Sequence, residues 1–130
     1  MIAIDTSAIL AILLGEPDGA LFLSAIMSED DCRLSAANLL EMRMVLYARD
    51  PANISDLDQF LKRMDIEIEP VTEYQSDLAF AAFRSFGKGM GHPAGLNFGD
   101  CLAYALARSH ACPLLFKGND FSQTDIISAI

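Results

Sequence analysis

The sequence MIAIDTSAILAILL, residues 1–14, decides the architecture of the chain. Its first four residues are apolar and end at Asp5, which predicts a buried strand. Thr6 or Ser7 can cap a helix over residues 8–14, and Asp5 is an alternative cap, because all three side chains can accept a hydrogen bond from a backbone N–H group. A short, wholly apolar strand that leads straight into a helix is typical of a parallel sheet covered by helices.

The rest of the chain continues this alternation of strands and helices. Short apolar or alternating runs predict three further strands, at residues 32–35, 67–71 and 112–116. Apolar residues at helical spacing predict helices at residues 17–27, 36–49, 54–64, 72–86 and 100–110. The sequence therefore predicts an α/β fold with a parallel sheet covered on both faces, and residues 1–130 are expected to form one domain.

The chain is both acidic and apolar. Its 130 residues include 18 Asp and Glu against 9 Lys and Arg, a net charge of −9, while 52% are hydrophobic and the mean hydropathy is +0.30. This apolar content excludes a disordered chain. The negative charge repels nucleic acid unless local groups offset it. The excess of apolar residues indicates that part of the surface is shared with a partner.

Three widely spaced cysteines, Cys32, Cys101 and Cys112, form no CxxC pair and no even-numbered disulfide framework. They are typical of small buried side chains in a reducing compartment. The longest apolar run, residues 8–14, is too short to span a membrane, and the N-terminal segment lacks the basic residues of a signal peptide. We therefore expect a cytoplasmic protein with no membrane partner.

Four acidic residues lie where an α/β sheet binds its ligands. Asp5 and Asp120 follow predicted strands, Asp100 begins a predicted helix after the glycine-rich loop 87–93, and Glu41 lies in the first turns of another helix. Ligands of open α/β sheets bind beyond the carboxyl ends of the strands, so these four side chains are expected to lie together. Four carboxylates without His or Cys favour Mg²⁺ or Mn²⁺ over zinc.

Each of these acids also has a purely structural interpretation. Asp5 and Asp100 are favoured N-caps of helices, and Asp120 stands in a turn-forming sequence beside Gly and Asn. Glu41 can pair with Arg43, although adjacent residues on a helix do not face each other. The joint occurrence of four acids at the strand ends is what favours a cation site.

Four sequence blocks resemble those of PIN-domain nucleases, and more closely those of the VapC-type toxins of bacterial toxin–antitoxin pairs. The blocks are Ile4-Asp-Thr-Ser7, Ser35-Ala-Ala-Asn-Leu-Leu-Glu41, Leu96-Asn-Phe-Gly-Asp-Cys-Leu-Ala-Tyr-Ala105 and Leu115-Phe-Lys-Gly-Asn-Asp-Phe121. Their order and spacing agree with the family over essentially the whole chain, and the third and fourth blocks are the most specific. The resemblance implies a PIN-like three-layer α/β/α sandwich with a small central parallel sheet.

The resemblance also implies a metal-dependent endoribonuclease that acts on single-stranded RNA. Its metal-binding and catalytic residues would be the four acids: Asp5, Glu41, Asp100 and Asp120. They would hold one or two Mg²⁺ or Mn²⁺ ions and activate a water molecule, leaving a 5′-phosphate on the downstream product. Supporting roles would fall to the hydroxyl of Thr6 and the amide of Asn119, while Asp125 is a weaker second candidate for the acid of the last block.

Five side chains near these blocks are candidates for binding the RNA backbone: Arg43, Arg84, Lys88, His92 and Lys117. For each of them an ordinary solvated position is the alternative. His92 is not expected to bind the metal, because the acids already supply enough oxygen donors. Phe98 can stack on a base, but a position in the core is the expected one.

The implied partners are a VapB-type antitoxin and a second copy of the chain. In the family, a flexible antitoxin segment lies in a groove of the toxin and often inserts a basic side chain among the acids. Two apolar helical stripes are candidate walls of such a groove, with packing in the chain's own core as the alternative for each residue. The stripes are Leu39, Leu40 and Met42 in one helix and Leu57, Phe60, Leu61 and Met64 in the next.

Two other functions fit part of the pattern. A receiver domain of a response regulator has this length, this fold class and a lysine after the last core strand, which Lys117 matches. It should also carry adjacent acids after the first strand and a phospho-acceptor Asp that ends a middle strand. Here Asp5 is followed by Thr6 and Ser7, and Asp56 lies at a predicted helix start. A catalytically inactive PIN module that only binds other proteins is the second alternative, which the presence of all four acids disfavours.

Overall fold

The opening segment forms the strand and helix that its sequence predicts. In the computed structural model, which describes all 130 residues, strand β1 covers Ile2–Ile4 and helix α1 covers Thr6–Leu13. The helix begins two residues earlier than predicted because its N-cap is Asp5, the alternative cap, and not Thr6 or Ser7. The Asp5 carboxylate accepts a hydrogen bond from the Ser7 backbone N–H at 3.0 Å.

The remaining elements follow in the predicted order, with shifted ends. They are α2 (Gly19–Met27), β2 (Cys32–Ser35), α3 (Ala36–Arg49), α4 (Asn53–Arg63), β3 (Ile66–Glu69), α5 (Glu73–Phe86), α6 (Phe98–Ser109), β4 (Leu114–Leu115) and the short 3₁₀ helix η1 (Phe121–Gln123). Helix α6 begins two residues before the predicted start because Asn97 is its N-cap. The last strand has two residues where five were predicted, and η1 was not predicted.

The four strands form one parallel sheet in the order β3-β2-β1-β4. Ile2 is in register with Cys32 of β2, and Ala3 is in register with Leu114 of β4. The chain moves from β1 to β2 to β3 in one direction and then returns to the other side of β1 for β4. The strand order therefore reverses between β1 and β4, and that is the place where open α/β sheets bind ligands.

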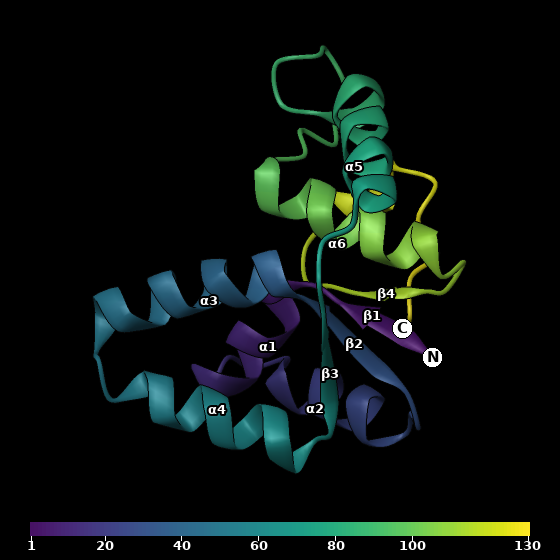
Figure 1. Cartoon of the computed structure of the whole chain (residues 1–130). Helices are drawn as coiled ribbons and strands as arrows, with labels where there is room; N and C mark the ends of the chain where they lie inside the picture. The colour runs from purple at the N-terminus through teal and green to yellow at the C-terminus, as the bar shows by residue number, and fades with distance from the viewer.

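Helices cover both faces of this sheet, which makes a sandwich of three layers (Figure 1). Within β1, Ile2 and Ile4 pack into a core cluster with α1–α4, while Ala3 packs into a second cluster with α5 and α6. This division follows from the alternation of side chains along a strand. Figure 1 shows α5 and α6 in the upper half of the view and α1, α2 and α4 in the lower half.

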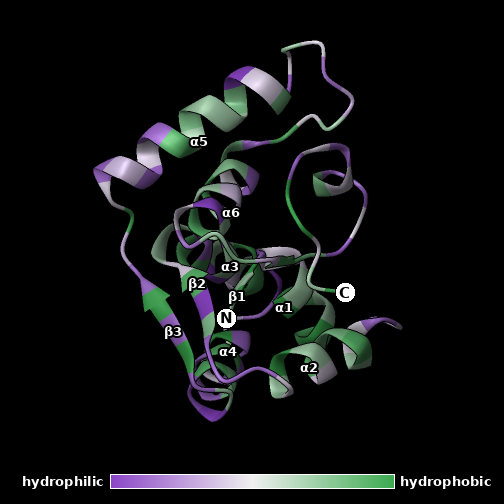
Figure 2. Cartoon of the chain, turned by 90° about the vertical axis from the view of Figure 1, so that its right-hand side faces the viewer, coloured by the Kyte–Doolittle hydropathy of each residue, from purple (hydrophilic) through white to green (hydrophobic).

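The outer strand β3 has a sequence that suits the edge of a sheet. Its residues alternate between isoleucine and glutamate, and Figure 2 shows the corresponding alternation of hydrophobic and hydrophilic segments along the strand. Charged side chains on an edge strand oppose pairing with other chains.

No helix of the structure combines the length and the apolarity that are needed to cross a membrane.

The two helical stripes predicted as groove walls lie mainly inside the molecule. Helices α3 and α4 pack side by side, and four of the seven residues belong to the core: Leu39, Met42, Leu57 and Leu61. The side chains of Phe60 and Met64 are half-buried against the same core. Only Leu40 of the predicted walls is well exposed, so for the four core residues the alternative, packing in the chain's own core, is the correct interpretation.

Candidate active site

A pocket of about 230 Å³ opens beyond the carboxyl end of β1, and three of the four predicted acids line it. Asp5 comes from the end of β1, Glu41 from α3 and Asp100 from α6. The other lining residues are Thr6, Ser7, Leu10 and Val45. We call this the acid pocket. The fold therefore brings together three carboxylates that are 36 and 59 residues apart along the chain.

Asp5 is the most deeply buried of the three acids, with 5% of its surface exposed. Its Oδ2 atom accepts two hydrogen bonds from Ser7, at 3.0 Å from the backbone N–H and 2.5 Å from the hydroxyl. Burial raises the pKa of Asp5 to about 6 from its ordinary 3.8, and the two Ser7 donors partly oppose this rise. The carboxylates of Asp100 and Glu41 raise the same pKa further.

Ser7 connects this acid to the loop that follows β4. Its hydroxyl oxygen accepts a hydrogen bond from the Lys117 backbone N–H at 2.9 Å while the hydroxyl hydrogen is donated to Asp5. The Lys117 ammonium group is paired with Glu16 and with Asp18, the latter at 3.1 Å. The segment that leads from β4 toward Asp120 is thus tied to α1 through its backbone and to the α1–α2 connection through its side chain.

Glu41 is held by donors from two different elements. Its Oε1 atom accepts a hydrogen bond from the Thr6 hydroxyl at 2.8 Å and a longer one from the Asn38 amide at 3.4 Å. The structure thus places Thr6 where an ordering role for its hydroxyl was predicted. The carboxylate lies against the backbone of Gly99, where any side chain would overlap Glu41 Oε2.

Asp100 belongs to the capping box of α6. Asn97 caps the helix with its side chain, accepting from the Asp100 N–H at 2.9 Å, and the Asn97 N–H donates to Asp100 Oδ2 at 3.0 Å. Burial raises the pKa of Asp100, the Asn97 N–H opposes the rise, and the carboxylates of Asp120 and Glu41 add to it. Asp100 therefore stands at the third position of the helix, not at the N-cap.

One oxygen of each carboxylate is held by the protein and the other is not. The oxygens that accept hydrogen bonds are Asp5 Oδ2, Glu41 Oε1 and Asp100 Oδ2. Asp5 Oδ1, Glu41 Oε2 and Asp100 Oδ1 accept none within the chain. Three fixed carboxylates, each with one uncommitted oxygen, are the donor set that a hard divalent cation prefers.

The other predicted acids stand apart from this group. Asp120 is exposed and does not line the acid pocket, although its charge is near enough to raise the pKa of Asp100. Asp125 accepts a hydrogen bond from the Tyr104 hydroxyl at 2.8 Å and lies 3.9 Å from Arg108, on a different part of the surface. Asn119 is exposed, and its backbone carbonyl accepts a bond from Ser122.

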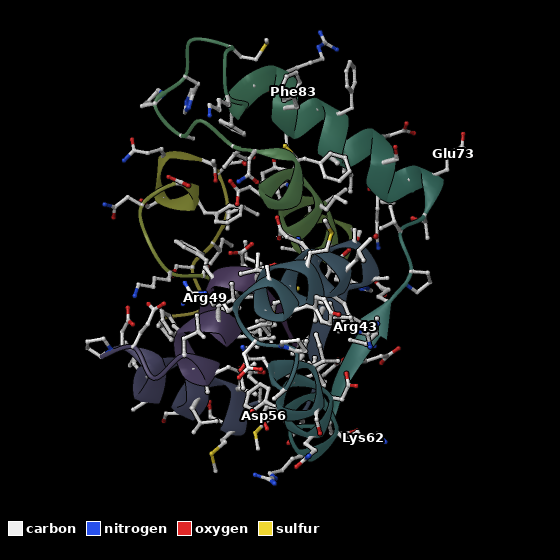
Figure 3. The ribbon with its side chains drawn as sticks, turned by 90° about the vertical axis from the view of Figure 1, so that its left-hand side faces the viewer. Arg43, Arg49, Asp56, Lys62, Glu73 and Phe83 are labelled. Atoms are coloured by element: carbon white, nitrogen blue, oxygen red, sulfur yellow. The ribbon has the colours of Figure 1, made fainter.

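No lysine, arginine or histidine lines the acid pocket. Arg43 points away from Glu41 and pairs with Asp58 at 3.4 Å, and Figure 3 shows it on the side of α3 next to β3. His92 accepts the Ala94 N–H at its Nδ1 atom and packs edge-on against Phe86. The negative charge of the pocket is therefore not neutralised by the protein's own side chains.

The other predicted RNA-binding residues are distributed over the surface. Arg84 is exposed on α5 with its guanidinium 5.9 Å from the centre of the Phe80 ring, and Lys88 lines an apolar pocket beside Phe83. Lys117 is engaged by two carboxylates, as described above. A role for any of these residues in RNA binding stays a prediction.

These carboxylates fit a divalent cation in chemistry, while their spacing is wider than that of a formed coordination shell. All donors are oxygens, and no cation of the protein competes for them. No three of the Asp, Glu, His and Cys side chains are grouped closely enough in the structure to hold a metal ion between them. The fit of the acid pocket to a divalent cation therefore rests on the chemistry of its donors.

An exposed apolar face borders the acid pocket. Phe98, which was expected in the core, has 81% of its surface exposed, because it is the first residue of α6 and projects beyond the layer that the helix covers. It lines both a pocket of about 330 Å³ and one of about 510 Å³. We define the apolar face by five exposed large side chains that line these two pockets: Leu40, Met44, Phe80, Phe83 and Phe98.

The sequence profile of the PIN domain matches residues 2–127 of this chain. The chain belongs to the PIN domain family. Among its relatives are ribonuclease VapC28 of Mycobacterium tuberculosis, 52% identical with 98% of this chain and 96% of the relative covered, and ribonuclease VapC30 of the same species, 45% identical with 95% and 94% covered. These matches confirm the family resemblance drawn from the four sequence blocks.

Solved structures confirm the fold. The toxin VapC20 of M. tuberculosis, described as cleaving the sarcin-ricin loop, superposes with a TM-score of 0.74 at 20% identity over 98% of this chain and 97% of that one. The structure named FitAcB from Neisseria gonorrhoeae superposes with a TM-score of 0.74 at 22% identity, with 98% and 96% of the two chains covered. The three-layer sandwich predicted from the sequence is therefore correct.

Sequence reasoning missed three residues of this site: Ser7 as a link to the β4 loop, Asn38 and Gly99. A signal was present for Asn38, which stands three residues before Glu41 and hence on the same face of its helix. Ser7 and Gly99 gave no comparable signal, because their partners lie 110 and 58 residues away along the chain.

Proposed function

We propose that this chain is an endoribonuclease that hydrolyses RNA phosphodiester bonds with the help of Mg²⁺ or Mn²⁺ and acts as the toxin of a toxin–antitoxin pair. The observation that carries the proposal is the acid pocket, with three carboxylates that each keep one oxygen free of protein donors. The proposal is supported by 52% identity to a chain named as a VapC ribonuclease. The receiver alternative finds no support in these relatives.

The residues proposed to hold the cation are Asp5, Glu41 and Asp100, with Asp120 joining from the edge of the pocket. A bound divalent cation supplies charge neutralisation at the phosphate and lowers the pKa of water that it binds. The protein fixes the other half of each carboxylate, since Ser7, Thr6 and the Asn97 N–H hold one oxygen of each acid in place. These contacts keep the free oxygens directed while substrate binds.

We expect the purified chain to cleave RNA only when a divalent cation is present. The experiment incubates the chain with separate pools of transfer, ribosomal and messenger RNA, in EDTA and then with added Mg²⁺ or Mn²⁺. Products with a 5′-phosphate are expected in the cation-containing samples, because water is the proposed nucleophile and the 3′-oxygen the leaving group. Cleavage that continues unchanged in EDTA contradicts the cation requirement. Absence of cleavage and of Mn²⁺ binding together favours the inactive protein-binding module.

The proposed protein partner is a small antitoxin of the VapB type. Relatives named VapC support this partner, and a cation-free acid pocket can accept a basic side chain from another chain. Structures that share the fold include one titled a toxin–antitoxin complex from Klebsiella pneumoniae, with a TM-score of 0.73 at 14% identity. We further propose that the pair acts in the cytoplasm, in keeping with three free cysteines.

A second copy of the chain is the proposed occupant of the apolar face. Exposed aromatic and aliphatic side chains gather there on three helices, and large contiguous apolar patches mark protein interfaces. The face is adjacent to the acid pocket, since Glu41 and Val45 line both that pocket and the neighbouring one of about 330 Å³. Figure 3 shows Phe83 of this face on α5, at the opposite end of the molecule from Lys62 on α4.

Phe80→Asp is expected to convert a dimer into a monomer. Phe80 is 63% exposed on α5 and does not line the acid pocket, so the charge disturbs the interface and not the core or the site. Loss of a central aromatic contact costs about 2 kcal/mol or more, a rise of at least roughly 30-fold in the dimer dissociation constant. Sedimentation velocity measures this. Met27→Asp is the matched control, since Met27 is 69% exposed on α2. A dimer that survives Phe80→Asp but dissociates in the control would place the interface elsewhere.

A further inference from the structure

Asn38 is a wholly buried amide that connects two elements of the acid pocket. Its Nδ2 atom donates to the Gly99 carbonyl in the first turn of α6 at 3.0 Å and to Glu41 Oε1 at 3.4 Å. Glu41 stands one turn further along α3, and Gly99 is the residue before Asp100. One amide group thus contacts both a carboxylate of the pocket and the backbone beside another.

Packing alone does not account for an amide at this position. The Asn38 Oδ1 atom is buried and has no hydrogen-bond partner, and leaving a buried acceptor unpaired costs about 1–3 kcal/mol. A leucine, which has the same branching but two methyl groups in place of the amide oxygen and nitrogen, would avoid this cost. The two bonds from Nδ2 are therefore what distinguishes asparagine from an apolar residue here.

Gly99 completes the same arrangement from the side of α6. The Glu41 carboxylate lies so close to the Gly99 backbone that a Cβ atom at this position would overlap all three of its terminal atoms, at 2.1–2.7 Å. Glu41 is thus pressed against the first turn of α6, with Asn38 bonded to both. This contact sets how far Glu41 stands from Asp100.

We propose that Asn38 is a positioning residue for the cation site. Its amide joins Glu41 to the start of α6, so that Glu41 and Asp100 are held on contacting elements, from which their free oxygens can converge on one divalent ion. Thr6 holds the same Glu41 oxygen but is attached to α1, so it cannot fix Glu41 relative to α6. This role rests on the proposed function, because it has meaning only if the acid pocket binds a cation.

The test measures the affinity of the purified chain for Mn²⁺ alone, by isothermal titration calorimetry. In Asn38→Leu the dissociation constant for Mn²⁺ is expected to rise about 10–100-fold, as for other residues that orient metal ligands. The midpoint of thermal unfolding without cation is expected to stay the same or rise, because the unpaired acceptor is gone. In RNA cleavage kcat is expected to fall, with little change in KM. Gly99→Ala, which displaces Glu41 from the other side, is expected to weaken Mn²⁺ binding as well.

Asn53→Leu is the matched control, since the Asn53 amide also donates to a backbone carbonyl, that of Leu46, and neither residue lines the acid pocket. Its affinity for Mn²⁺ should equal that of the unchanged chain. If the unchanged chain binds no Mn²⁺ and cleaves no RNA, the proposed function fails and this inference with it. If the unchanged chain binds Mn²⁺ but Asn38→Leu binds it within twofold as tightly, only the positioning role is overturned. Should Asn38→Leu not fold, Asn38→Ser, which is too short to reach Gly99, takes its place with the same two outcomes.

Discussion

Asp100→Asn is expected to reduce RNA cleavage by at least about 100-fold while leaving the fold intact. The substitution removes one negative charge and one carboxylate oxygen from the acid pocket, and a direct ligand should matter more than the outer residues, whose loss costs about 10–100-fold. The fold should persist because the asparagine side-chain oxygen can still accept the Asn97 N–H of the capping box. Initial rates of cleavage at saturating Mg²⁺ measure the effect, and circular dichroism checks the fold.

The control for this experiment is Asp56→Asn. Asp56 is an acid in the first turn of α4, and Figure 3 shows it on the far side of the molecule from α5. The control has the same change of charge and should cleave RNA at the rate of the unchanged chain. Equal loss of activity in both variants would mean that net charge, and not the acid pocket, determines the rate. Full cleavage by Asp100→Asn would refute the assignment of Asp100 to the site.

Asp5→Asn is expected to abolish cleavage and, in the absence of cation, to stabilise the chain at pH 8. The folded-state pKa of Asp5 is about 6 and its ordinary value is 3.8, so the folded chain binds this proton more tightly than the unfolded chain. The contribution of the Asp5 carboxyl to the free energy of unfolding is therefore fully present below about pH 4 and is lost as the pH rises through 6. The loss corresponds to roughly 3 kcal/mol at pH 8. Asparagine carries no charge and caps helices equally well, so it should recover most of that loss.

Urea unfolding of both chains at pH 5 and pH 8, with EDTA present, measures this effect. The gain in the free energy of unfolding should be clearly larger at pH 8 than at pH 5, because Asp5 is mostly protonated in the folded chain at the lower value. A gain that is independent of pH would show that the burial of Asp5 does not disfavour its charge. Stability and activity are thus expected to move in opposite directions in a single variant, which is typical of a residue kept for function.

The places of Asp5 and Glu41 in the acid pocket were predictable. Asp5 follows an apolar strand, and the carboxyl ends of parallel strands meet at one edge, so an acid that directly ends such a strand lies near the switch point. Asp120 stands five residues beyond β4, at an exposed position, so the same rule did not place it in the acid pocket. Glu41 was predictable from its apolar neighbours on one helix face. Both inferences need only local sequence and one rule of topology.

Contacts between distant segments were not predictable in the same way. Lys117 is close in sequence to Asp120, but its ammonium group forms ion pairs with Glu16 and Asp18, about 100 residues away. Phe98 is the kind of residue that belongs in a core, but it is the exposed first residue of α6, while most residues of that helix from Gly99 onward are buried. Contacts between segments that are distant in sequence decide whether such a side chain is paired, buried or exposed. A single sequence does not reveal these contacts.

The three acids of the pocket come from both core clusters of the molecule. Glu41 stands on a helix of one cluster, Asp100 on a helix of the other, and Asp5 at the end of the strand whose side chains enter both. The pocket thus lies between two halves of the molecule, which also meet through the sheet and through the contact of α3 with α6. A cation bound there would contact both halves and would raise the free energy of unfolding by an amount that grows with the cation concentration. Whatever occupies the acid pocket, metal or a basic side chain of another protein, would therefore raise the free energy of unfolding of the whole chain.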